Sequence, residues 1–219
     1  MLSKRLEAIY SLVEKNSQVA DIGCDHGYLL IELYKNNVCS KLLGVDNKKG
    51  PLNSALSNLK KEKLDGKIKL SLSNGLKSVT DEYNTIVLAG LGSDTIIKVV
   101  NDDINKLNFI DTFIIDSHTD CPKIRHFFVN LGYFVDKEII LKEKNIIYTI
   151  IRFKKGDRIY NELEYIYGPY LLKNKSDEFI NIYKEKLDYL TDLITKANNK
   201  EYFSKIEKEI EEIKYILNF

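Results

Sequence analysis

The sequence predicts an α/β fold whose mostly parallel, doubly wound sheet is followed by a C-terminal helical hairpin. Short apolar runs typical of buried strands alternate strictly with amphipathic helical patterns up to about Gly156. Strict alternation indicates βαβ crossovers, and therefore a parallel sheet covered by helices on both faces. After Gly156 the strand-like runs stop and two long helical stripes replace them. We therefore expect one domain over residues 1–156 and a second, helical one over 157–219.

The first domain opens with an amphipathic helix over residues 2–15, because Leu2, Leu6, Ile9 and Val13 recur at helical spacing. The strands that we predict after it span residues 18–23, 41–46, 67–73, 84–90, 111–117, 134–142 and 146–153. The helices that we predict between them span residues 27–36, 50–63, 93–102 and 121–131. The short segment Lys-Glu-Lys-Asn at 142–145 joins the last two strands, so these form an antiparallel hairpin at one edge. A parallel sheet with such an edge indicates the methyltransferase variant of the doubly wound fold.

The second domain places apolar side chains on one stripe in each of two segments. The stripes consist of Phe179, Ile182, Tyr183, Leu187, Leu190, Ile194 and Ala197, and of Phe203, Ile206, Ile210, Ile213 and Leu217. Asn-Asn-Lys at 198–200 interrupts the pattern, which favours an antiparallel, coiled-coil-like hairpin over one long helix.

The composition excludes several classes of protein. The 219 residues are 44% hydrophobic and 30% charged, as in globular proteins, and no apolar run approaches the roughly 18 residues of a membrane span. The N-terminal segment is unlike a secretory signal, so we expect a cytoplasmic protein. Cys24, Cys39 and Cys121 form no CxxC pair, so we expect reduced thiols and no metal.

The net charge of +1 is unevenly distributed. Residues 35–69 contain nine lysines against Asp46, Glu62 and Asp65. Such a segment is either an ordinary solvated face or a surface that binds phosphates, and the sequence leaves both interpretations open.

The loop after the first predicted strand reads Asp21-Ile-Gly-Cys-Asp-His-Gly27 and is the first candidate site. Ligands of open parallel sheets bind outside the carboxyl ends of the strands, and Gly23 lets such a turn pass close to a ligand. Asp21 stands where a dinucleotide-binding loop has its first glycine, and its charge would repel a pyrophosphate and attract an amine. This pattern favours S-adenosyl-L-methionine, which carries an ammonium and no phosphate, over a dinucleotide.

Two later strand ends support a nucleoside cofactor. Asp46 follows Gly23 at a spacing that lets a carboxylate reach ribose hydroxyls. Asn74 could accept a hydrogen bond from an adenine amino group, although an ordinary Asn-Gly turn explains it equally well.

The loop after the fourth strand, Gly90-Leu91-Gly92, offers no acid, base or nucleophile before Asp94. It also lacks the Asn/Asp-Pro-Pro-aromatic motif typical of methyltransferases that act on exocyclic amines. A ring nitrogen such as adenine N1 has a free lone pair, so methyl transfer to it requires mainly positioning.

Three residues of the first loop suit such a base. Asp25 would stabilise the cationic product, His26 could bind the base and Tyr28 could stack on it. The alternative is structural: Asp25 caps the next helix and Tyr28 packs in the core.

Several segments together resemble the bacterial tRNA adenine-22 N1-methyltransferase family. These are LSKRLEAIYSLV, ADIGCDHGYL, GVDNKKGPLNSA, SNGL, VLAGLG, KIRHFFVNLGY and YGPYLLKNKSDEFINIYKEKLDYL, in this order and over essentially the whole chain. The resemblance implies the Rossmann-like fold of a class I S-adenosylmethionine-dependent methyltransferase, and an enzyme that methylates N1 of adenine 22 in tRNA. We expect it to be a monomer that needs neither membrane nor metal.

The resemblance also implies roles for individual residues. Asp25, His26 and Tyr28 would form the target-base pocket, which Asn58 would line. S-adenosyl-L-methionine would be bound by Asp21, Gly23, Cys24, Gly27, Asp46, Asn47, Asn74, Gly75, Ala89, Gly90, Leu91 and Gly92. The helical hairpin would help to hold tRNA, together with a basic face at Lys48, Lys49, Lys60 and Lys61.

The chain departs from the family pattern in three loops. Asn74 stands where the family usually has Asp, Leu91 and Ser93 replace Met and Gly, and Ser117-His118-Thr119 replaces Gln-Pro-Asn. Two alternatives therefore stay open: a methyltransferase for another RNA, small-molecule or protein acceptor, and a non-catalytic RNA-binding module.

Overall fold

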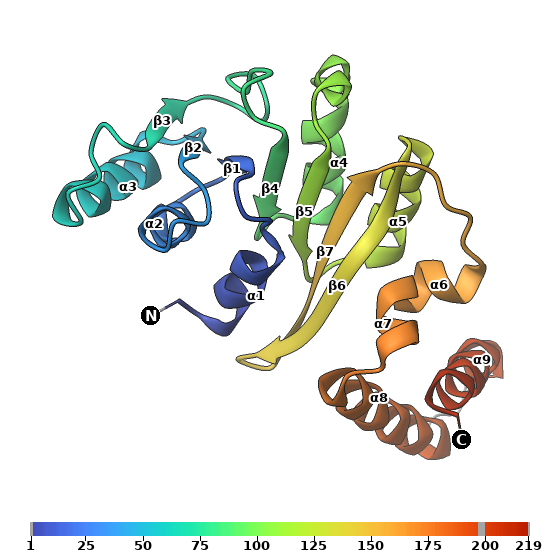
Figure 1. Ribbon diagram of the computed structural model, residues 1–219. Helices are drawn as coiled ribbons and strands as arrows, with labels where there is room; N and C mark the ends of the chain where they lie inside the picture. The colour runs from blue at the N-terminus through green and yellow to red at the C-terminus, as the bar shows by residue number, and fades with distance from the viewer. Residues whose placement is uncertain (1, 197–199, 219) are drawn as a thin grey trace.

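The computed structural model describes residues 2–196 and 200–218 and contains a single seven-stranded sheet in the order β3-β2-β1-β4-β5-β7-β6 (Figure 1). The strands are β1 (Gln18–Ile22), β2 (Lys41–Asp46), β3 (Lys69–Leu72), β4 (Thr85–Ala89), β5 (Thr112–Ser117), β6 (Tyr133–Glu143) and β7 (Ile146–Lys155). The first five are parallel, while β7 is antiparallel to both β5 and β6. The predicted fold class, with its antiparallel edge, is confirmed.

Helices cover both faces of this sheet (Figure 1). One face packs against α1 (Lys4–Leu12), α2 (Tyr28–Lys35) and α3 (Lys49–Lys61), the other against α4 (Ser93–Asn101), the 3₁₀ helix η1 (Ile104–Asn108) and α5 (Cys121–Asn130). Because β1, β2, β4 and β5 are buried on both faces, they are almost continuously apolar. The first helix is shorter than the predicted 2–15, since Ser3 Oγ caps it by accepting a hydrogen bond from Leu6 N and Val13 is already extended.

The β6–β7 ribbon extends past the rest of the sheet. Ser117, the last residue of β5, lies opposite Thr149, which pairs with Ile140 of β6. Three further residues on each strand continue beyond this point, which projects the ribbon by about 10 Å at 3.4 Å per residue. The turn at its end consists of Lys144 and Asn145, with φ of 49° and 64°. This overhang lies on the side of the sheet where the parallel strands end.

Two short helices, α6 (Glu162–Tyr167) and α7 (Pro169–Asn174), precede the helical hairpin and were not predicted. Each has six residues, too few to show helical periodicity. Their boundaries follow from a capping box at Asn161 and from Pro169 at the first helical position.

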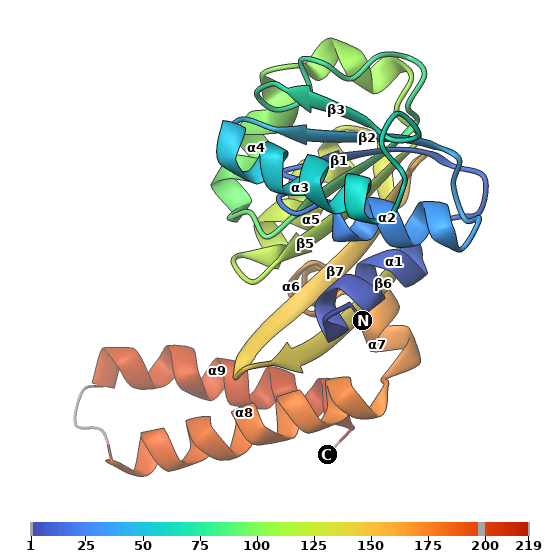
Figure 2. The same ribbon diagram turned by 90° about the vertical axis from the view of Figure 1, so that its left-hand side faces the viewer.

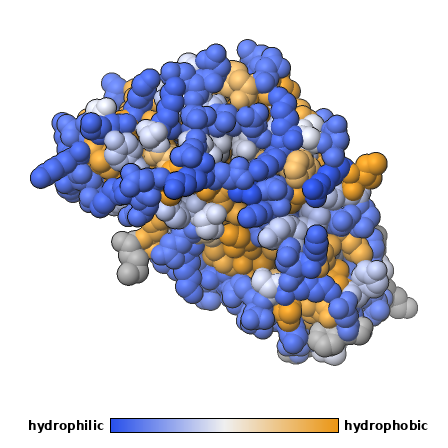
Figure 3. Space-filling model, in the orientation of Figure 1, coloured by the Kyte–Doolittle hydropathy of each residue, from blue (hydrophilic) through white to orange (hydrophobic). Residues whose placement is uncertain are grey.

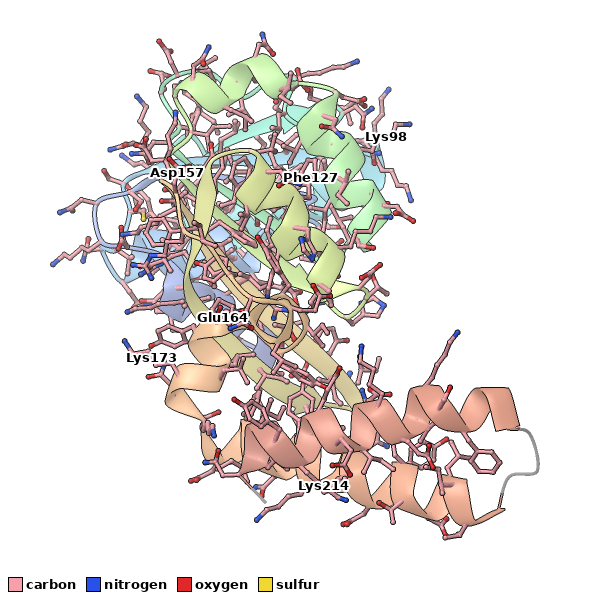
Figure 4. The ribbon with its side chains drawn as sticks, turned by 90° about the vertical axis from the view of Figure 1, so that its right-hand side faces the viewer. Lys98, Phe127, Asp157, Glu164, Lys173 and Lys214 are labelled. Carbon is pink, nitrogen blue, oxygen red and sulfur yellow. The ribbon has the colours of Figure 1, made fainter. Side chains whose placement is uncertain are left out.

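A buried ion pair joins these two helices to the sheet. Arg125 of α5 donates to Glu138 of β6 at 2.7 Å, and also to the Tyr165 carbonyl at the end of α6. Glu138 in turn accepts the Tyr170 N–H at the start of α7. Gly168, with φ of 95°, lies between the helices, where a Cβ atom would collide with both charged groups. Figure 4 shows the neighbouring helices, with Phe127 labelled on α5 and Glu164 on α6.

The chain ends in two helices, α8 (Asp177–Lys196) and α9 (Lys200–Leu217), that lie side by side beyond the carboxyl edge of the sheet (Figure 2). The predicted apolar stripes face each other, with Phe179, Ile182 and Leu190 against Ile206 and Ile213. Ala197, predicted to end the first stripe, and Asn198 and Asn199 of the predicted break lie outside the described residues. The division at 156/157 stays a prediction. No helix in the described part of the chain has the length and apolarity that crossing a membrane requires.

Candidate active site

The largest concentration of candidate residues surrounds a cavity of about 410 Å³ at the carboxyl ends of β1, β2 and β4. Eight residues predicted to bind a cofactor line it: Gly23, Asp46, Asn47, Asn74, Gly75, Ala89, Gly90 and Leu91. They come from four separate loops, which the parallel strands bring to one edge of the sheet. This is where the fold predicts a ligand.

Three residues of the β1–α2 loop, which borders this cavity, have a left-handed backbone conformation. Gly23, Asp25 and Gly27 have φ values of 81°, 46° and 70°. A Cβ atom on Gly27 would lie 3.3 Å from the Cβ of Ala55, so a glycine here lets α2 begin against α3. Asn58 of α3, predicted to line the target-base pocket, instead fixes the loop by donating its side-chain amide to the His26 carbonyl at 3.0 Å. The hollow that Asn58 lines is a separate one between α1, α2 and α3.

Asp46 ends β2 with its carboxylate at the cavity wall and only 8% of the residue exposed. One oxygen accepts the Lys48 N–H at 2.9 Å, and the other accepts the Asp25 N–H at 3.4 Å. These bonds orient the carboxylate and link the loops after β1 and β2. Its remaining acceptor capacity can bind the hydroxyl groups of a ribose.

Asp21 is the second buried carboxylate. It is 5% exposed, and its side chain accepts no hydrogen bond within the part of the chain that the structure describes. Burial, and secondarily the charge of Asp46, raises the pKa of Asp21 to about 7. An unpartnered carboxylate of this kind suits a cationic ligand group, which would compensate the cost of its ionisation.

A smaller hollow of about 80 Å³ adjoins the cavity and shares Arg5, Gly23, Asp25 and Ala89 with it. Its wall includes His26 and Tyr28, whose rings stack with centroids 5.5 Å apart. His26 Nε2 lies 3.5 Å from a carboxylate oxygen of Asp25. These three side chains, predicted to hold the target base, therefore lie together beside the cofactor cavity.

The structural alternatives for Asp25 and Tyr28 are not observed. The residue that caps α2 is Gly27, which has no side chain, and Tyr28 is 48% exposed rather than in the core. Both side chains are available to a ligand.

Other predicted residues lie behind the cavity. Cys24 is buried in the core and burial raises the pKa of its thiol, whereas Gly27 and Gly92 are the N-caps of α2 and α4. These three residues shape the loops that reach the cavity. In the described part of the chain, no cluster of His, Cys, Asp and Glu could hold a metal ion.

Arg5, which no sequence motif singles out, lines both hollows. Its guanidinium lies 3.4 Å from a carboxylate oxygen of Asp116, which also accepts the Gly90 N–H at 3.2 Å. The Arg5 guanidinium also lies 5.3 Å from the centre of the Tyr148 ring. Burial raises the pKa of Asp116, whose other oxygen has no partner among the described residues. Arg5 thus connects α1 to the end of β5 and, through Asp116, to the loop after β4, an arrangement for which no local sequence signal exists.

The four lysines of the predicted basic face lie at both ends of α3. Lys48 and Lys49 begin the helix and Lys60 and Lys61 end it. Other lysines of the segment are neutralised, since Lys35 pairs with Glu62 and Lys41 with Glu82, each at 2.8 Å. The basic face at Lys48, Lys49, Lys60 and Lys61 stays a prediction.

The strand order, the antiparallel edge and a nucleoside-type cavity with a carboxylate after β2 define a class I methyltransferase. Comparison with known families agrees with this class and also identifies the family within it. Residues 19–216 match the TrmK family, described as tRNA (adenine(22)-N(1))-methyltransferase. The chain belongs to this family, and the predictions of family, enzyme class and cofactor are confirmed.

Individual relatives cover nearly the whole chain. The tRNA (adenine(22)-N(1))-methyltransferase of Bacillus subtilis is 24% identical over 99% of this chain and 97% of its own. The structure of M. capricolum TrmK with S-adenosyl-homocysteine is 32% identical, has a TM-score of 0.84 and covers 99% of this chain and 98% of its own. The structure of Streptococcus pneumoniae Sp1610 with S-adenosyl-L-methionine is 26% identical, with a TM-score of 0.89 and coverage of 99% and 100%.

Proposed function

We propose that this protein methylates N1 of adenine 22 in tRNA, with S-adenosyl-L-methionine in the 410 Å³ cavity and the target adenine at Asp25, His26 and Tyr28. The observation that carries the proposal is the contact of the two hollows across Gly23, Asp25 and Ala89. A methyl donor in one and an acceptor base in the other would meet there. Because its substrate is tRNA, we propose that the protein acts in the cytoplasm, and that it does so as a monomer.

The residues of the cavity fit the cofactor. Asp46 can hold the ribose hydroxyls, and Asn74 beside Gly75 can accept a hydrogen bond from the adenine amino group. Asp21 lines the adjoining smaller hollow and not the cavity itself, so its buried, unpartnered carboxylate would meet a cationic group of the cofactor only where the two hollows join. Arg5, which lines both hollows, offers a partner for a carboxylate. The lining contains two cations, Arg5 and Lys48, and two carboxylates, Asp25 and Asp46, so it carries no excess positive charge for a pyrophosphate.

S-adenosyl-L-methionine supplies, when bound, an electrophilic methyl group on a cationic sulfur. The protein's part is to orient the acceptor, because adenine N1 already carries a free lone pair. Tyr28 would stack on the base and His26 would hydrogen-bond it. The Asp25 carboxylate would stabilise the positive charge that the ring acquires as N1 is methylated.

Two tRNA transcripts that differ only at position 22 test the proposal. Unmodified tRNA with adenine 22 should accept one methyl group per molecule, whereas the transcript with guanine 22 should accept none. Equal methylation of both transcripts would show that the enzyme modifies another nucleoside.

Cofactor affinity should depend on pH through Asp21. Because the pKa of Asp21 is raised in the folded protein without ligand, the folded protein binds a proton at Asp21 more tightly than the unfolded chain does. The stabilisation that protonated Asp21 gives the folded state is therefore lost as pH rises from about 4 to about 7.

Ionised Asp21 is the form that attracts the cofactor ammonium. The dissociation constant should therefore rise by up to about tenfold per pH unit below 7, as measured by calorimetry. Asp21→Asn should bind more weakly at pH 7 and lose this pH dependence, and a variant that keeps it would assign the titration to another group.

tRNA affinity should depend on the lysines of α3. Reversing Lys60 and Lys61 to glutamate should weaken tRNA binding and lower the slope of log Kd against log salt by about one for each phosphate that the helix no longer neutralises. Lys49→Glu tests the other end of α3 in the same way. Lys48→Glu is less informative, because Lys48 also lines the cofactor cavity and its replacement could change cofactor affinity as well. The control is Lys35→Glu, because Lys35 is already paired with Glu62. An unchanged slope in the Lys60 and Lys61 variant would place tRNA on another face.

A further inference from the structure

We propose that the overhang of the β6–β7 ribbon is an apolar wedge that enters tRNA beside the target adenine and separates it from a stacked neighbour. The proposal rests on the function proposed above. Adenine 22 belongs to a folded RNA, and an enzyme that modifies a base must first take it out of its stack. Apolar side chains inserted between bases are a common means of doing so.

The overhang has the right position. It consists of Leu141–Glu143 and Ile146–Tyr148 with the turn between them, and it projects about 10 Å past the carboxyl edge at which the candidate site lies. Tyr148 contacts Arg5, which lines both the cofactor cavity and the base hollow. The ribbon is therefore continuous with the site and extends beyond it toward the approaching substrate.

The end of the overhang is apolar and exposed. Ile146 and Ile147 are 44% and 41% exposed, although exposed strand ends usually carry charged side chains. Successive residues of a strand point to opposite faces, so Ile146 shares the face of Tyr148 while Ile147 lines a cavity of about 330 Å³ toward α8. Figure 3 shows apolar surface where the ribbon passes between the sheet and the helical hairpin. Two neighbouring isoleucines thus present apolar surface on both sides of one projecting edge.

Contacts with α8 hold the overhang in place, and a wedge that separates stacked bases has to be rigid. The Lys142 N–H donates to Glu178 of α8 at 3.1 Å, and Lys142 Nζ lies 2.6 Å from Glu185 of the same helix. The two-residue turn allows little internal freedom. The helical hairpin therefore acts as a buttress for the ribbon.

A nucleic acid suits this edge better than a protein partner does. The exposed Lys144 and Asn145 at the turn can contact phosphate and sugar groups, while the isoleucines contact base faces. A protein-binding surface would in addition block the approach of tRNA to the adjoining hollow.

The test compares wild-type protein with the double variant Ile146→Ser, Ile147→Ser on two RNAs. One is intact unmodified tRNA, and the other is the same tRNA with abasic nucleotides on both sides of adenine 22, where no stack has to be opened. The variant should lose about tenfold or more in kcat/KM on intact tRNA. Its rate on the abasic tRNA should equal that of the wild type, and its cofactor affinity should be unchanged.

A matched control is available at the opposite edge of the sheet. Ile159 is fully exposed in the segment between β7 and α6, and Ile159→Ser should leave both rates unchanged. An equal loss on both RNAs, or no loss on intact tRNA, would overturn the wedge. Wild-type protein that does not methylate intact tRNA would instead refute the proposed function.

A fluorescence measurement tests the wedge without turnover. With S-adenosyl-homocysteine present, 2-aminopurine next to adenine 22 should brighten when saturating wild-type protein binds, because unstacking relieves its quenching. The double variant should bind and produce less than half of this rise. The same rise with the variant would contradict the proposal.

Discussion

Replacing Asp46 with alanine should raise the dissociation constant of S-adenosyl-L-methionine by about 100-fold. Each charge-assisted hydrogen bond from a ribose hydroxyl to this carboxylate contributes about 1.5 kcal/mol or more, and a loss of about 3 kcal/mol corresponds to about 100-fold. The change also removes the acceptor of the Lys48 and Asp25 N–H groups, which loosens both loops. Isothermal titration calorimetry measures the effect.

Asp46→Asn separates these two contributions. Asparagine keeps the shape and one oxygen acceptor of the side chain but loses its charge. The dissociation constant of Asp46→Asn should therefore lie between those of the wild type and Asp46→Ala. Unchanged affinity in both variants would remove Asp46 from the cofactor site.

Replacing Asp25 with asparagine should lower kcat by about 10- to 100-fold while the cofactor dissociation constant changes by less than about twofold. Removing one group that stabilises developing charge in a closed site costs about 100- to 1000-fold, and the Asp25 side chain is 63% exposed in the free protein, which weakens its field. Asparagine is the right replacement, because it tolerates the φ of 46° and matches the size of aspartate while it removes the charge.

Single-turnover methyl transfer at saturating cofactor and tRNA measures this step without product release. Tyr28→Phe is the matched control, because it keeps the stacking surface and should keep most of the rate. Full turnover by Asp25→Asn would show that the carboxylate has no part in the reaction.

The sequence revealed the parts of the site that depend on local order along the chain. The loop from Asp21 to Gly27, Asp46 and the Asn74-Gly75 turn each follow a recognisable strand, and parallel strands bring their ends to one edge. The alternation of strands and helices was therefore enough to predict that these loops lie together.

Contacts between distant segments could not be predicted in this way. Arg5 reaches Asp116 only because α1 packs across the sheet, and Arg125 meets Glu138 only because α5 lies against β6. The reach of the ribbon likewise depends on where β5 ends relative to β6 and β7, which is a matter of register. Each of these features depends on tertiary packing, for which a single sequence carries no periodic signal.

The most direct measurement is to incubate the protein with methyl-labelled S-adenosyl-L-methionine and unmodified tRNA, digest the RNA and identify the labelled nucleoside and its position. We predict a single product, 1-methyladenosine at position 22. Label at N6 of an adenine or at another position, or no label although the cofactor and tRNA both bind, would contradict the proposed function.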